Sequence, residues 1–281
     1  PYVIETVTGE KTNFEELGGA VTNNTKSGNA HFACESDEDA IEKVKILLSY
    51  IPDNNLDDPP RVLLGDDPQR LCPELDNLIP DNPKAGYNMH DVIHSILDLG
   101  EFFEVHELYA NNAIVGFGRL NGWTVGIIAN QPLVLAGCLD INASDKISRF
   151  IRFCDAFNIP LITFVDVPGY LPGTDQEWGG IIRHGAKLLW SYSEATVPKL
   201  TVTTRKSYGG AYIAVSSQHL GADMLFAWPS AEIAVMGAQG AVNIVASYRK
   251  AIKEAADQEA MRQQKIQEYE DAFNTPYIAA E

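Results

Sequence analysis

Apolar residues recur along this chain either at helical spacing or in short continuous runs. Acidic residues that begin at Asp37 lead into apolar positions three and four residues apart, which predicts an amphipathic helix over Asp37–Tyr50. Asn121-Gly122 stands between two apolar runs and predicts a β-hairpin. The runs Leu161–Val165 and Lys199–Thr203 predict buried strands.

Helical patterns lie between and after these runs. Ser144 is a candidate N-cap for a helix whose apolar face continues to Phe157, and Gly179–Ala195 predicts a second helix. A third helix is expected to begin at Gly209, and Ile233–Met236 predicts another strand. This order of strands and helices favours an α/β fold with buried strands.

The two ends of the chain differ from this core. Residues 1–51 contain one clear element, the helix at Asp37–Tyr50, and one amphipathic helix cannot close a core alone. Residues 52–61 are rich in Pro, Asp and Asn and predict a linker. Residues 62–281 are expected to alternate strands and helices from their start and to finish in a polar helical tail, Ser247–Phe273. We therefore expect the end of one domain, a linker and a second domain.

Composition and charge exclude several classes of protein. The chain has 281 residues with 21 Lys and Arg against 38 Asp and Glu, a net charge of −17, which disfavours binding to nucleic acid. Its apolar runs are shorter than the ~20 residues that span a bilayer, and no signal region opens the sequence, so we expect no direct membrane insertion. The four cysteines are far apart without a C-x-x-C pair, which fits a reducing compartment, cytoplasmic or the mitochondrial matrix in a eukaryote.

A possible metal motif occurs at His90-Asp-Val-Ile-His94. Two imidazoles one helical turn apart resemble the zinc-binding H-E-x-x-H pattern, but Asp replaces the Glu that acts as general base there. No third ligand follows at a suitable spacing. We therefore interpret these histidines as surface or capping residues and expect no metal.

Two glycine-rich segments follow the predicted buried strands. Asp166–Glu177 combines two Gly with two Pro, and Arg205–Tyr212 opens the helix predicted at Gly209. Ligands of α/β folds bind outside the carboxyl ends of the strands, where both segments are expected. Each segment could equally be an ordinary tight connection or a closely packed helix start.

The second segment suits the stabilisation of negative charge. The free N–H groups of Gly210 and Ala211 would point outward at the positive end of the helix dipole, as a developing oxyanion requires. We expect this turn to face the loop Pro168–Gln176 across a pocket. The sequence has no G-x-S-x-G nucleophile elbow. Because Glu177 and Glu194 lie on a helix and Asp223 comes late, no side-chain base is obvious.

These segments carry a resemblance to a known family. The chain resembles the carboxyltransferase β subunit of biotin-dependent acyl-CoA carboxylases, the propionyl-CoA and acetyl-CoA carboxylases. Related subunits of methylmalonyl-CoA transcarboxylases and sodium-pumping decarboxylases share most of its motifs. The residues that carry the resemblance are Glu5–Glu10, Phe14–Ala20, Val125–Pro132, Asp166–Glu177, Gly180–Lys187, Ala195–Lys199, Thr204–Tyr212 and Ala227–Ala241.

The resemblance implies a crotonase-like (ClpP/crotonase) fold and a biotin-dependent reaction. Gly210 and Ala211 match the pair whose amides hold the ureido oxygen of biotin, and Gly169, Tyr170, Tyr212 and Ile213 are assigned to substrate binding. Propionyl-preferring relatives carry Asp where this chain has Ile213, whereas some acetyl-accepting relatives carry Ile, so the acyl length stays open.

The resemblance also implies cofactors and partners. The carboxyl group would move from biotin on a carrier protein to the α-carbon of an acyl-CoA, and only a partner biotin carboxylase would use ATP. The subunit would form a homo-oligomer, a hexamer, with active sites between subunits. The sequence starts near the end of the family's N-terminal domain and stops short of its usual C-terminus, so it is expected to be a fragment. A non-enzymatic scaffold would predict a disrupted Gly209–Ala211 turn, which is intact here.

Overall fold

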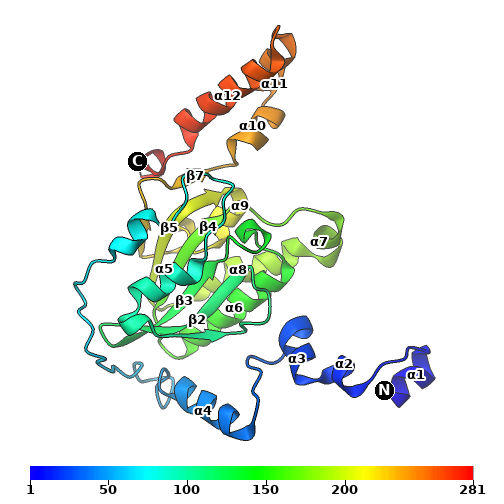
Figure 1. The fold of residues 1–281 in the computed structure, drawn as a ribbon, viewed down its shortest axis with the longest axis vertical. Coiled ribbons are helices and arrows are strands. Elements are labelled where there is room, and N and C mark those ends of the chain that lie inside the picture. Colours follow the sequence, from blue (N-terminus) through cyan, green and yellow to red (C-terminus); the bar gives the residue numbers. More distant parts are fainter. Residues whose placement is uncertain (281) are drawn as a thin grey trace.

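The computed structural model describes residues 1–280 and is built around a seven-stranded sheet. The sheet order is β1-β2-β3-β4-β5-β6, and β7 pairs with the far part of β5 (Figure 1). The strands are β1 Phe102–Val105, β2 Ala113–Leu120, β3 Trp123–Asn130, β4 Leu161–Val167, β5 Lys199–Tyr208, β6 Met224–Ala227 and β7 Glu232–Ala234.

Strand direction divides the sheet into two parts. β1, β2 and β3 are antiparallel, and the turn between β2 and β3 is the predicted Asn121-Gly122 hairpin. From β3 onward neighbouring strands are parallel, so β3, β4 and β5 all end at one edge of the sheet. The α/β prediction is confirmed, and both predicted buried strands extend further than the sequence indicated.

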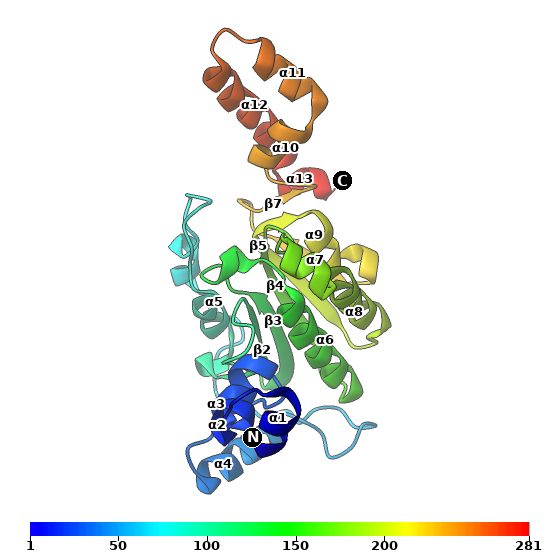
Figure 2. The same ribbon diagram turned by 90° about the vertical axis from the view of Figure 1, so that its right-hand side faces the viewer.

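Helices cover both faces of the sheet (Figure 2). α6 and α8 lie on one face, where Phe117 and Ile128 of the sheet share a core with Ile147 and Tyr192 of these helices. α5 lies on the other face over a second core. Successive residues of β3 alternate between the two cores, which is why its apolar run is continuous. The covering helices are α5 Met89–Ile96, α6 Ile141–Ala156, α8 Ile181–Glu194 and α9 Gly209–Ala214, whereas the short helix α7 Thr174–Gly179 projects away from the sheet with no buried residue (Figure 1).

The predicted helix starts were partly wrong. α6 begins at Ile141, three residues before the proposed cap Ser144, because the Asp140 carboxylate accepts the N–H of Ala143 at 2.8 Å. Ser144 is buried one turn inside and donates to the Asp140 carbonyl oxygen. The predicted helix Gly179–Ala195 is confirmed as α8, which begins two residues later at Ile181 because Gly180, at φ +91°, separates it from the preceding short helix α7.

The N-terminal segment contains more helices than predicted. α4 Asp37–Leu48 confirms the predicted helix, and Ser36 caps its N-terminus with a hydroxyl that accepts the Asp39 N–H. Tyr50 packs against Phe117 in the core beneath the sheet. The division into two domains at residues 52–61 stays a prediction. The other helices here are α1 Tyr2–Thr8, α2 Phe14–Gly18, α3 Ala20–Thr22 and the π-helix η1 Asn23–Ser27.

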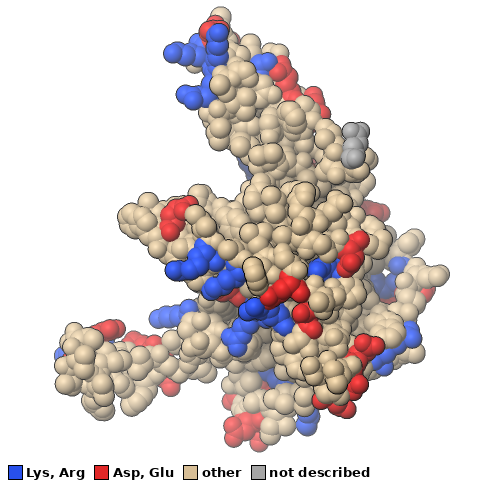
Figure 3. All heavy atoms as spheres, turned by 180° about the vertical axis from the view of Figure 1, so that it is seen from behind, with Lys and Arg blue, Asp and Glu red and all other residues tan. Residues whose placement is uncertain are grey.

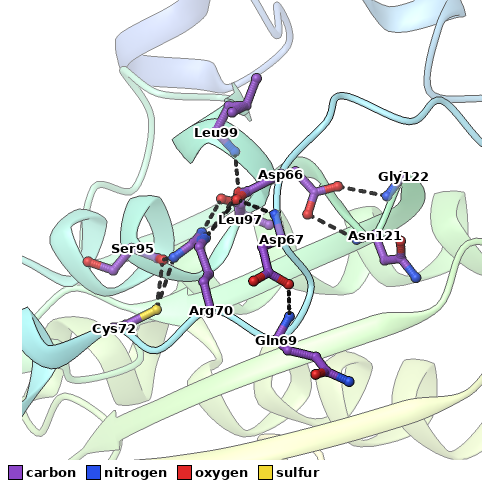
Figure 4. Close-up of polar contacts among 11 residues, drawn as sticks. Asp66, Asp67, Gln69, Arg70, Cys72, Ser95, Leu97, Leu99, Asn121 and Gly122 are labelled. Atoms are coloured by element: carbon purple, nitrogen blue, oxygen red, sulfur yellow. Dashed lines mark hydrogen bonds and ion pairs between the residues drawn. The ribbon is translucent and has the colours of Figure 1, made fainter.

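Residues 62–88 contain no strand, which corrects the expectation that strands begin there. Polar contacts hold this segment instead (Figure 4): the Asp66 carboxylate accepts from Arg70 and from the Leu99 N–H. Arg70 in turn donates to the Leu97 carbonyl at 2.9 Å. Short 3₁₀ turns complete the connections: η2 Pro73–Asn77, η3 Asp98–Gly100, η4 Leu135–Gly137 and η5 Gln218–Leu220.

The C-terminal helices extend beyond the sheet as an arm (Figures 1 and 2). Their contacts are mostly with one another, around a small core formed by Ala238, Ala241 and Tyr269. The helical tail predicted from the sequence is thereby confirmed, as two helices rather than one. The elements are α10 Ala238–Ile244, α11 Ala246–Glu254, α12 Gln258–Phe273 and α13 Pro276–Ala279.

Candidate active site

The turn from β5 into α9 lies at the edge where the parallel strands end. Gly209 has φ +58°, and a Cβ at this position would lie 2.9 Å from the Val235 carbonyl oxygen, so the turn requires glycine. A Cβ on Gly210 would meet nothing within 4 Å. The backbone at Gly210 is therefore accessible to a ligand.

The N–H groups of Gly210 and Ala211 are free donors. They belong to the first turn of α9, where a helix leaves its N–H groups without internal acceptors, and no other acceptor for them is found among residues 1–280. Ala211 is fully buried, so its own methyl group packs in the core. The geometry fits a ligand that presents an anionic or carbonyl oxygen to two backbone donors.

The glycine-rich loop after β4 lies at the same edge of the sheet. Gly169 has φ +152° with no atom near its absent side chain, and its carbonyl oxygen accepts the Leu139 N–H. The Tyr170 ring lies against Gly185 of α8, and its hydroxyl is buried without a partner in residues 1–280. Burial raises the pKa of Tyr170 to about 12. Tyr170 therefore turns its hydroxyl toward α8, and its assignment to substrate binding stays a prediction.

Tyr212 and Ile213 occupy different surroundings. Tyr212 lines a cavity of about 640 Å³ together with Ser207, Ile233 and Tyr277, and no residue of the loop Pro168–Gln176 lines this cavity. Ile213 is 40% exposed, so it is not a core residue of α9. This cavity is therefore not the pocket expected between the loop Pro168–Gln176 and the Gly209 turn. The roles of Tyr212 and Ile213 in substrate binding stay predictions.

Acidic residues considered as bases are engaged elsewhere. Glu194 pairs with Arg152 at 2.5 Å at the end of α8, and Asp223 accepts the Lys199 N–H at the start of β5. Both lie toward the sheet edge opposite the Gly209 turn. Neither carboxylate therefore lies beside the free N–H groups of Gly210 and Ala211.

The two candidate metal-binding histidines make hydrogen bonds inside the fold. His90 Nε2 lies 2.7 Å from Glu104 Oε2, and this contact raises the pKa of His90. His94 Nδ1 lies 2.7 Å from the Gly100 carbonyl oxygen. Within residues 1–280, no three His, Cys, Asp or Glu side chains are grouped to hold a metal ion.

Sequence reasoning missed a buried polar group beside the turn. Asp166 is 1% exposed and pairs with Arg205, which is 7% exposed, at 3.0 Å. Arg205 also lies over the Tyr87 ring, and burial together with the Asp166 charge raises the pKa of that tyrosine. The available signal was an acid directly after the apolar run Leu161–Val165 and a base two residues after the predicted strand Lys199–Thr203.

Positively charged side chains do not form a continuous patch on the face opposite to that seen in Figure 1. Figure 3 shows Lys and Arg side chains interspersed with Asp and Glu on that face. No helix in residues 1–280 combines the length and the apolar character needed to cross a bilayer.

The fold and the comparisons define the class of this protein. A mixed sheet covered by helices, with free amides after its parallel strands, is the crotonase-like carboxyltransferase fold found in solved relatives. The profile described as carboxyl transferase domain matches residues 1–281, and the chain belongs to this family.

Individual relatives cover all of this chain. It is 59% identical to the carboxyltransferase subunit of propionyl-CoA carboxylase from Haloferax mediterranei and 58% identical to the methylmalonyl-CoA decarboxylase subunit alpha from Veillonella parvula. A transcarboxylase 12S structure, a hexamer with methylmalonyl-coenzyme A bound, superposes with a TM-score of 0.95 at 55% identity over 100% of this chain and 53% of that one. The chain spans 54% and 53% of the two sequence relatives, about half their length.

Proposed function

We propose that this chain forms the biotin-side part of a carboxyltransferase. It would act in the transfer of a carboxyl group from carboxybiotin to the α-carbon of a short-chain acyl-CoA, propionyl-CoA or acetyl-CoA. Membership of the carboxyl transferase family over residues 1–281 carries this proposal. The similarity to a propionyl-CoA carboxylase subunit favours its substrate class.

The residues of the Gly209 turn fit biotin, which supplies a carrier for the carboxyl group when it is bound. Its ureido oxygen would accept from the N–H groups of Gly210 and Ala211. The open space at Gly210 admits a close approach of the ring. Preorganised donors of this kind stabilise negative charge as it develops, without reorientation during the reaction. The chain would thus contribute orientation and charge stabilisation rather than a side-chain base.

The proposed function also requires partner proteins. A biotin carboxylase, which alone would use ATP, and a biotin carrier protein would deliver the carboxyl group, and the complete subunit would form a homo-oligomer. The hexamer reported for the 12S relative supports the last point.

The test removes one donor. Ala211→Pro deletes the N–H while the first turn of a helix tolerates proline. In the complete subunit with its biotin partners, carboxyl transfer should fall roughly a hundredfold to a thousandfold, the cost of one oxyanion donor in other enzymes. Ala246→Pro, at the exposed first residue of α11, is the matched control and should leave the rate unchanged. Near-normal transfer by a folded Ala211→Pro variant would remove this amide from the site.

A second function is favoured by the 58% identity to a methylmalonyl-CoA decarboxylase subunit. In that case the carboxyl group would move from a malonyl-type CoA onto biotin, within a sodium-pumping decarboxylase or a transcarboxylase. The partner distinguishes the two functions. Purification of the complete subunit with a biotin carboxylase supports the first, and purification with a membrane subunit supports the second.

A further inference from the structure

A buried carboxylate joins β4 to β5 just before the Gly209 turn. Asp166 accepts the Nε–H of Arg205 at 3.0 Å on one oxygen and the backbone N–H of Lys206 at 3.1 Å on the other. Because Asp166 is 1% exposed, both contacts are shielded from water.

These contacts coincide with an irregularity in strand pairing. Val165 faces Thr203 and Val167 faces Ser207, so three residues of β5 lie opposite Asp166 alone. A bulge of this kind removes ladder hydrogen bonds and redirects the strand. The carboxylate gives the Lys206 N–H the acceptor that the ladder cannot supply at this point.

The residues of the bulge also contact the segment before α5, at Ala85 and Tyr87. Arg205 donates to the Ala85 carbonyl oxygen at 2.8 Å, and the Tyr87 hydroxyl lies 2.9 Å from Thr204 Oγ1. Thr204 Oγ1 also donates to the Val165 carbonyl oxygen at 3.1 Å. Regular pairing resumes at Ser207, two residues before Gly209. The direction in which β5 leaves the bulge therefore determines where the following amides point.

We propose that Asp166 is a positioning residue for carboxyl transfer. Its carboxylate fixes the β5 bulge and thereby sets the orientation of the Gly210 and Ala211 N–H groups toward the bound oxygen. The inference rests on the proposed function. A buried ion pair is often no more stabilising than apolar residues of similar volume, whereas it does impose a defined geometry. Stability and positioning can therefore be separated by mutation.

Two variants of the complete subunit test this role. Asp166→Asn keeps the shape but leaves Arg205 without its counter-charge. The double variant Asp166→Leu with Arg205→Met replaces the pair by apolar side chains, which should preserve the fold while the Lys206 N–H loses its acceptor. We expect both to lower kcat about a hundredfold with the KM for acyl-CoA little changed, because a misplacement of about 1 Å has this effect on rate.

A matched control exists at the opposite edge of the sheet. Asp98 is 6% exposed and its carboxylate accepts the N–H groups of Asn121 and Gly122 at 2.9 and 2.7 Å, the two amides of the hairpin turn in Figure 4. Asp98→Asn should lower the melting temperature and leave kcat unchanged. Hydrogen–deuterium exchange at residues 209–212 should accelerate in the Asp166 variants and not in Asp98→Asn.

The possible outcomes distinguish a failure of the positioning role from a failure of the proposed carboxyltransferase function. If Ala211→Pro abolishes transfer while a folded Asp166 variant has normal kcat and normal exchange at the turn, the positioning role is wrong and the function stands. If Ala211→Pro has no effect, both fail. If the single and the double variant both fail to fold, Asp166 is required for the fold itself, and the positioning role is likewise overturned.

Discussion

The ammonium group of Lys146 is buried and surrounded by backbone carbonyl oxygens. Its Nζ donates to the carbonyl oxygens of His106, Tyr109 and Ala113 at 2.9, 2.7 and 2.6 Å, and Lys146 is 2% exposed. These bonds attach α6 to the segment that leads into β2. Lys146→Met keeps the length of the side chain and removes all three donors, so the variant isolates the contribution of the hydrogen bonds.

The expected loss follows from the acceptors left behind. Each buried acceptor without a partner costs about 1 to 3 kcal/mol, so three of them cost roughly 3 to 9 kcal/mol. The substitution also removes the desolvation penalty of the ammonium, which is several kcal/mol. We therefore expect Lys146→Met to lower the free energy of unfolding by about 2 to 4 kcal/mol, at the upper end for single substitutions.

Denaturant unfolding followed by circular dichroism measures this loss. Lys187→Met is the control, because Lys187 is paired with Asp145 at 2.8 Å but its side chain is 50% exposed. An exposed pair is worth about 0 to 1 kcal/mol, so this variant should stay within that range of the parent. A loss below about 1 kcal/mol for Lys146→Met would show that water or relaxation satisfies the carbonyl groups and would refute the reasoning.

Two further predictions concern acid stability and substrate choice. Burial, with the nearby charges of His31 and Lys146, lowers the pKa of His106 from 6.5 to about 4. At pH values between about 4 and 6.5 the unfolded state binds a proton that the folded state does not. The free energy of unfolding therefore falls on acidification through this range, by up to about 3 kcal/mol. His106→Gln should flatten this part of the profile of unfolding against pH, and an unaltered profile contradicts the assignment. Ile213→Asp should change the ratio of kcat/KM between acetyl-CoA and propionyl-CoA by an amount of order 1 to 3 kcal/mol, and unchanged ratios at equal stability exclude Ile213 from the acyl pocket.

Local sequence patterns predicted the elements whose structure depends on residues close together in the sequence. The Asn121-Gly122 hairpin, the strand at Leu161 and α4 all appear as expected, because turn chemistry and apolar periodicity act over a few residues. The start of α6 was misplaced, since Asp140 and Ser144 are both capable caps one turn apart. Residues 62–88 were misjudged because their order depends on distant contacts such as that of Asp66 with Leu99.

The same distinction applies to the candidate site. The Gly209 turn could be predicted because glycine at a strand end followed by a helix has a local meaning, and its φ of +58° agrees with it. The position of Tyr170 could not be predicted, because it depends on the space left by Gly185 in a helix that follows later in the chain. The pairing of Asp166 with Arg205 likewise joins residues from two neighbouring strands.

The charged residues at the ends of the apolar runs nevertheless carry structural information. A regular parallel ladder satisfies each backbone N–H of a buried strand, so apolar side chains suffice there. Where three residues of β5 oppose Asp166, an N–H loses its ladder partner and burial makes that loss costly. The short carboxylate of Asp166 reaches the Lys206 N–H across the bulge, and Arg205 balances its charge. An acid at the end of one buried strand and a base late in the next strand can thus indicate that the pairing of the two strands shifts. Here the shift lies shortly before the amides that we propose contact biotin.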